Sequence, residues 1–99
     1  MIERISLNSL KFFYFVAKYG SVTLAAKKLF VTQSAASKQI YKLEESINLV
    51  LFDRKNKTLQ MTKEGEQLFN CCQKIFNQLD ECLIDLSSNK FEKKQLVLW

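Results

Sequence analysis

The sequence contains no histidine and no proline, and it has only two glycines among its 99 residues. A structural zinc site usually takes four cysteine or histidine ligands, so three cysteines are too few, and we predict no metal and no cofactor. An odd number of cysteines also argues against a disulfide framework, and Cys71, Cys72 and Cys82 are expected to be reduced thiols. Because no linker-like stretch occurs before about residue 88, we predict one small domain.

The groups that enzymes need are also missing. No histidine can activate Ser34 or Ser37 as a nucleophile, and the chain has no glycine-rich phosphate loop and no spaced carboxylate pair. We interpret the neighbouring Glu44 and Glu45 as a surface turn of a helix rather than as an acid–base pair. The sequence therefore predicts no catalytic residues and a protein that is not an enzyme.

Long apolar runs and a leader segment are absent as well. The longest apolar run without a charge, Phe12 to Ala17, is far too short to cross a membrane. The N-terminus starts with Met-Ile-Glu-Arg and soon becomes amphipathic, which is not typical of a secretory signal. These observations predict a protein without membrane contact that is located in the cytoplasm.

Positive charge is concentrated in the first three-fifths of the chain. Residues 1–60 contain ten lysines and arginines against four acidic residues, a net charge of +6, whereas residues 61–99 contain five lysines against six acidic residues, a net charge of −1. Such a distribution suits binding to a polyanion such as nucleic acid. Charge alone is equally compatible with a solvated surface that keeps the protein soluble.

Helical periodicity divides the first half of the chain into three helices. Ser6 or Asn8 can cap the first helix, which Gly20 closes, and Ser21 or Thr23 can cap a short second one. Thr32 is expected to cap the third helix. Its apolar side is formed by residues at steps of 4, 3 and 4, namely Ala36, Ile40, Leu43 and Ile47. Two helices joined by a tight turn over about residues 21–40 predict a helix-turn-helix.

The pattern changes after Asn48. Two short β-prone runs, residues 49–52 and 58–61, flank the basic segment from Asp53 to Lys57, which predicts a small hairpin. A hairpin in this place can reach the DNA backbone or the minor groove beside a recognition helix. We therefore predict that residues 5–62 form a mainly α winged helix-turn-helix domain with three helices and a short β-hairpin wing.

The front of the third helix carries small and polar side chains that suit the major groove. Ser34 and Ser37 are small enough for the backbone to approach DNA closely, and the Gln33 amide can pair with adenine. Lys38 can donate to guanine or to a phosphate. The residues predicted to contact double-stranded DNA are Thr32, Gln33, Ser34, Ser37, Lys38, Lys42, Arg54, Lys55 and Lys57.

A long final helix is predicted over residues 63–88, with Thr62 as its cap. One of its apolar rows follows steps of 4-3-4-3-4, which is typical of a coiled-coil seam, and a second row of Phe69, Phe76 and Leu83 runs beside it. A helix of roughly 37 Å is longer than the domain needs. We predict a homodimer through the first row, which consists of Leu68, Cys72, Ile75, Leu79, Cys82 and Leu86, with the second row turned toward the chain's own domain.

The run from Ser21 to Leu68 strongly resembles the signature of LysR-type transcriptional regulators. The corresponding residues follow in register without a gap: Ser21, Thr23, Ala25, Ala26, Leu29, Val31, Gln33, Ser37, Gln39, Ile40, Leu43, Glu44, Leu51, Phe52, Arg54, Met61, Thr62 and Gly65. The resemblance spans roughly residues 5–88 and implies a sequence-specific DNA-binding regulator of transcription. It places the family's DNA contacts on Gln33, Ser34, Ser37, Lys38 and Arg54, and its subunit-pairing linker helix on residues 63–88.

The chain departs from that signature at four positions. Ser34 replaces a proline, Ala36 a larger apolar residue, Lys38 an arginine and Asn48 a glycine. Serine restores a backbone N–H and a hydroxyl that can contact DNA, and lysine keeps the charge but loses the guanidinium fork. The departures are expected to leave the fold intact and to change the base preference.

LysR-type proteins usually continue into an effector domain. We interpret residues 89–99, which end in Leu96-Val97-Leu98-Trp99, as a hinge and the first strand of an effector domain that is missing here. A small-molecule effector is therefore expected only where such a domain exists. The alternative function is a winged-helix protein–protein interaction module without sequence-specific DNA binding.

Overall fold

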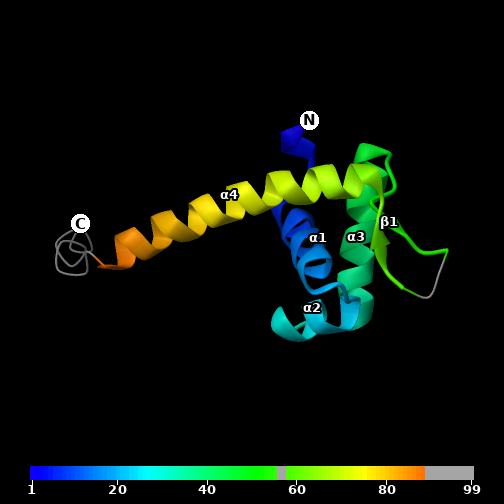
Figure 1. The fold of residues 1–99 in the computed structure, drawn as a ribbon, viewed down its shortest axis with the longest axis horizontal. Helices are drawn as coiled ribbons and strands as arrows, with labels where there is room; N and C mark the ends of the chain where they lie inside the picture. Colours follow the sequence, from blue (N-terminus) through cyan, green and yellow to red (C-terminus); the bar gives the residue numbers. More distant parts are fainter. Residues whose placement is uncertain (56–57, 89–99) are drawn as a thin grey trace.

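The computed structural model describes residues 1–55 and 58–88, and one long helix lies across the end of a small helical domain (Figure 1). The elements follow in the order η1 (Ile2–Arg4), α1 (Leu7–Tyr19), α2 (Val22–Lys28), α3 (Gln33–Ile47), β1 (Phe52–Asp53), β2 (Gln60–Met61) and α4 (Lys63–Ser88). β1 and β2 pair antiparallel, with Phe52 opposite Met61. The predicted mainly α winged helix-turn-helix with a long final helix is confirmed. Lys57 and the predicted hinge at 89–99 lie outside the described residues.

Each of the four α-helices begins at a hydroxyl side chain that caps its first turn. Each capping oxygen accepts a hydrogen bond of 3.0–3.3 Å from the backbone N–H three residues later, and the caps are Ser6, Ser21, Thr32 and Thr62. A cap of this kind stabilises a helix by about 1 kcal/mol. α1 and α3 end at residues in the left-handed conformation, Gly20 with φ 65° and Asn48 with φ 56°. Asparagine tolerates this conformation, so the departure at Asn48 leaves the helix end intact.

The core lies where α1, α3 and the start of the wing meet. The Phe13 and Phe52 rings pack with their centroids 5.4 Å apart. The predicted apolar side of the third helix is confirmed, since Ala36, Ile40 and Leu43 are buried. Buried alanines where α2 meets α1 and α3 leave room for the short helix to approach closely, and they are Ala25, Ala26 and Ala36.

The wing has shorter strands than the sequence predicts. The β-prone runs at 49–52 and 58–61 form only two-residue strands, at 52–53 and 60–61. The backbone N–H of Leu51 donates to the Glu44 carboxylate at 2.7 Å, and its carbonyl accepts from the N–H of Thr62 at 2.9 Å. The bond to Thr62 continues the register of the β1–β2 pairing, whereas the N–H groups of Leu51 and Phe52 donate to Glu44 of α3 and are not available for a longer ladder.

α4 contacts its own domain along its first half only. Phe69 and Phe76 both pack on Tyr14 of α1, with ring centroids 5.4 and 5.1 Å away. Gly65 is buried beside the wing, where a Cβ atom would overlap the carbonyl oxygen of Leu51. The second half of the helix projects away from the domain (Figure 1), and every residue from 77 to 88 is exposed.

The burial of Cys72 corrects the predicted dimer seam. Cys72 is 3% exposed and belongs to the core of its own domain. The reason is helical geometry: Cys72 lies three residues after Phe69 and four before Phe76, so all three side chains share the inner face. Leu68 also packs against this core. The free apolar surface of α4 therefore starts further along the helix than the heptad pattern suggests.

Candidate nucleic-acid interface

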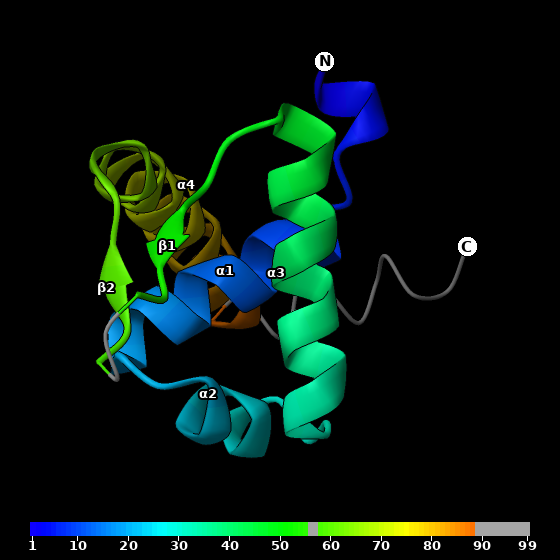
Figure 2. The same cartoon turned by 90° about the vertical axis from the view of Figure 1, so that its right-hand side faces the viewer.

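The helix-turn-helix is formed by α2, a short turn and α3. The turn is closed by a 3.0 Å hydrogen bond from the backbone N–H of Val31 to the carbonyl of Ala26. Phe30, at the tip of the turn, has φ 58° and is 95% exposed. α2 packs across the N-terminal end of α3, and among the described residues no other element crosses the outer side of α3 (Figure 2).

The outer side of α3 gathers most of the residues predicted to read bases. One shallow, open hollow, here called the front face, is lined by Gln33, Ser34, Ser37, Lys38 and Tyr41. Tyr41 was not among the predicted contacts, although its spacing of four residues from Ser37 places it on the same side of the helix. The structure thus unites four predicted residues and adds a fifth.

Two of the predicted contacts on the helix-turn-helix already have intramolecular partners. The Thr32 hydroxyl oxygen caps α3 by accepting from the N–H of Ala35 at 3.0 Å. The Gln33 side-chain carbonyl accepts a 3.1 Å hydrogen bond from the hydroxyl of Thr23 on α2. This bond uses one of the two lone pairs of the amide oxygen, and the amide N–H₂ group of Gln33 can still donate to acceptors on a base edge.

The root of the wing is fastened to α3 by one buried carboxylate. Glu44 is 9% exposed, so its interpretation as part of a surface turn is wrong. Its carboxylate accepts from the backbone N–H of Leu51 at 2.7 Å and of Phe52 at 3.2 Å, and it pairs with Arg54 Nη1 at 3.3 Å. Two N–H donors and a guanidinium compensate for the cost of removing this charge from water.

Arg54 is held on two sides. Besides its ion pair with Glu44, its guanidinium carbon lies 4.3 Å from the centre of the Tyr41 ring. The side chain keeps 35% of its surface exposed. Lys55 is exposed beside it, and its backbone N–H donates to the Asp53 carboxylate at 3.0 Å. In the described part of the wing, Arg54 is therefore held by two contacts, whereas the neighbouring Lys55 side chain is exposed to solvent.

A family model for bacterial regulatory helix-turn-helix proteins of the lysR family matches residues 7–66. The chain belongs to the LysR family. The glycine cleavage system transcriptional activator of Escherichia coli (strain K12) is 47% identical over 75 residues, which cover 76% of this chain and 25% of that protein. The transcriptional activator AmpR of Citrobacter koseri is 41% identical over 80 residues, which cover 81% of this chain and 28% of that protein. This LysR-family chain spans about a quarter of the length of these relatives.

Solved structures of the family share the arrangement of helices and wing. The crystal structure of the BenM DNA-binding domain in complex with catB site 1 DNA superposes with a TM-score of 0.76 at 29% identity, covering 84% of this chain and 93% of that one. Full-length AphB, as its N100E variant, superposes with a TM-score of 0.74 at 28% identity, covering 84% of this chain and 29% of that one.

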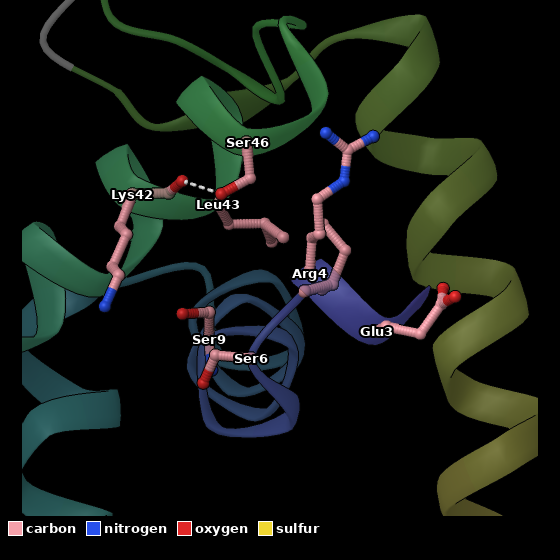
Figure 3. A pocket seen from close by; sticks show the side chains of 8 residues that line it. Glu3, Arg4, Ser6, Ser9, Lys42, Leu43 and Ser46 are labelled. Carbon is pink, nitrogen blue, oxygen red and sulfur yellow. Dashed lines mark hydrogen bonds between the residues drawn. The ribbon is translucent and has the colours of Figure 1, made fainter. Parts of the chain in front are cut away.

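Lys42 lies apart from the front face of this LysR-type domain. It lines a separate hollow of about 220 Å³ between η1, the start of α1 and α3 (Figure 3). Figure 3 shows the Lys42 and Arg4 side chains pointing away from each other, so the two cations do not converge on a common ligand. The Ser46 hydroxyl in this hollow donates to the Lys42 carbonyl at 2.8 Å.

The thiols of the domain differ in exposure. The pKa of Cys72 is raised from its ordinary value of about 9 to about 11, mainly by burial and to a smaller extent by the charge of the neighbouring Cys71. This thiol therefore stays protonated. Cys71 and Cys82 are exposed.

Within residues 1–55 and 58–88, no group of three or more metal-ligating side chains comes together. None of the helices in these residues is long and apolar enough to span a membrane.

Proposed function

We propose that this chain binds double-stranded DNA sequence-specifically, as the DNA-binding part of a LysR-type regulator of transcription. The observation that carries the proposal is the front face of α3, an open hollow in which Gln33, Ser34, Ser37 and Lys38 lie together. A helix with small polar side chains at its N-terminal end fits the major groove. The protein would then work in the cytoplasm, where bacterial DNA lies.

The relatives support this proposal. Those named above are called transcriptional activators, and the BenM DNA-binding domain has been solved on DNA. No feature of the described residues specifically favours the alternative of a winged-helix protein–protein interaction module. A small-molecule effector would be a property of the longer regulators, of whose length this chain spans about a quarter.

Within the interface we propose two kinds of contact. Gln33, Ser34, Ser37 and Lys38 would read base edges in the major groove. Contacts to the DNA backbone would come from Thr32 at the N-terminus of α3 and from Arg54 and Lys55 of the wing. Lys42, which lies apart from the front face, and Lys57, which lies outside the described residues, remain predicted backbone contacts. The phosphate contacts would supply affinity that depends on salt, and the base contacts would supply specificity.

We also propose that two copies pair through the free apolar surface of α4. Ile75, Leu79 and Leu86 are each 48% exposed, and every residue of α4 from 77 to 88 is exposed. Cys82 is exposed on the same row, and the partly buried Leu68 would lie at its edge. A symmetric dimer would present two recognition helices to a palindromic DNA site with half-sites about one helical turn, or a multiple of it, apart.

The DNA proposal is tested by selecting duplexes from a random-sequence library with the unchanged chain and measuring binding by gel shift. Lys38→Ala should weaken binding to the selected duplex by about 1–3 kcal/mol and relax the preference over random duplex. Lys74→Ala removes the same charge from an exposed position on α4 and should change binding little. Equal losses on selected and random duplexes for Lys38→Ala would contradict its base-reading role.

A further inference from the structure

Tyr41 joins the front face of α3 to the wing. Tyr41 lies three positions after Lys38 and three before Glu44, so all three project from neighbouring positions on α3. Its ring lines the front face together with Lys38, and the Arg54 guanidinium lies over that same ring at 4.3 Å. Tyr41 is 54% exposed, so burial in the core does not account for its place.

The Arg54 guanidinium is braced by two different contacts. Glu44 Oε1 accepts a hydrogen bond from one terminal nitrogen of Arg54, Nη1, at 3.3 Å, and the guanidinium carbon lies over the Tyr41 ring. A guanidinium has five N–H donors, so a single pairing leaves donors that can turn toward a phosphate or a groove edge. A cation over an aromatic face is attracted to the ring, and more strongly when water is removed.

We infer that Tyr41 is a positioning residue for DNA binding, which holds Arg54 of the wing in register with the recognition helix. This inference rests on the proposed function, because it concerns how the DNA-binding surface is assembled. Glu44 anchors the root of the wing through Leu51 and Phe52, and Tyr41 then fixes where the first wing cation points. Binding DNA with Arg54 already in place avoids the entropy of ordering a long side chain.

The test compares two substitutions of Tyr41 on the selected duplex, by fluorescence anisotropy. Tyr41→Phe keeps the aromatic face, and its affinity should stay within about twofold of the unchanged chain. Tyr41→Leu keeps apolar bulk without that face and should weaken binding about 3- to 10-fold. In a chain that already carries Arg54→Ala, Tyr41→Leu should add less than about twofold, because the group it positions is gone.

Each other result overturns the inference. Equal losses for Tyr41→Phe and Tyr41→Leu would show that the hydroxyl contacts DNA directly, and an additive loss in the Arg54→Ala chain would show that Tyr41 acts without Arg54. A drop of more than about 5 °C in melting temperature for Tyr41→Leu would assign the residue to the stability of the domain. Tight binding by Tyr41→Leu would refute this inference alone, whereas no binding by the unchanged chain to any duplex would refute the proposed function as well.

Discussion

The two halves of α4 form one continuous helix but lie in different surroundings. In the first half Gly65 and Cys72 are buried, and Phe69 and Phe76 pack on Tyr14. In the second half every residue is exposed, although it carries apolar side chains at similar spacing, namely Leu79, Leu83, Ile84 and Leu86. An apolar row on a helix therefore does not by itself show whether the chain's own domain covers it, and only the position of the helix in the fold decides that.

The largest effect is expected in the exposed half, if the proposed dimer forms there. Leu79→Asp would place a charge in the seam at a cost of about 3 kcal/mol or more, so the dissociation constant of the dimer should rise at least about 100-fold. Sedimentation equilibrium of the full chain measures this directly. Asn77→Asp adds the same charge on the opposite side of the helix and should leave association unchanged. An unchanged chain that is monomeric at tens of micromolar would contradict the dimer.

The buried half should respond most strongly at Gly65. In Gly65→Ala the new Cβ atom overlaps the carbonyl oxygen of Leu51, which cannot rotate out of the way as a side chain would. We expect a net loss of about 2 kcal/mol in the free energy of unfolding, because overpacking costs more than the helix propensity of alanine returns. Urea unfolding measures the loss, with Gln67→Ala as an exposed control. A more stable Gly65→Ala chain would show that α4 can move away from the wing.

Cys71 and Cys72 are neighbours on α4, but Cys71 is exposed and Cys72 is buried, so the same substitution can be compared on the outer and the inner face of the helix. Cys72→Ser places a hydroxyl in the core and should lower the free energy of unfolding by about 1–2 kcal/mol. Cys71→Ser makes the same change on the exposed side and should stay within about 0.5 kcal/mol. Equal effects of the two substitutions would mean that the first half of α4 does not rest on the domain as described.

The smallest effect concerns alkaline pH. The unfolded Cys72 thiol loses its proton near pH 9, whereas burial delays this to about pH 11 in the folded chain. Deprotonation therefore favours the unfolded state, and the contribution of this thiol to stability, complete below pH 9, is lost as the pH rises toward 11. The free energy of unfolding, measured with urea between pH 8 and 10, should fall more steeply with pH for the unchanged chain than for Cys72→Ala. Parallel curves would place the thiol in contact with water.

Local signals were sufficient to predict most of the elements. Hydroxyl caps, the end of α1 at Gly20 and the apolar side of α3 depend on residues close together in the sequence, and the structure bears them out. The signature residues were likewise enough to predict the family. The structure also unites Gln33, Ser34, Ser37 and Lys38 on one face, because they share one helix.

Contacts between distant segments could not be predicted in this way. Glu44 looked like a surface residue because nothing in its neighbourhood shows that the backbone of residues 51 and 52 will turn toward it. Cys72 fitted a heptad seam as well as it fits the core. Tyr41 gained a role only when the wing brought Arg54 over its ring.

By itself, then, the sequence determined the helices, their caps, the hairpin and the LysR-type identity, because hydrogen bonds and side-chain periodicity within a helix involve residues only three or four positions apart. The tertiary structure alone decided which apolar row of α4 is covered, which carboxylate is buried and which tyrosine meets the wing. Those outcomes depend on contacts between distant segments. α4 meets the wing at Gly65 and α1 at Tyr14, and α3 meets the wing at Glu44.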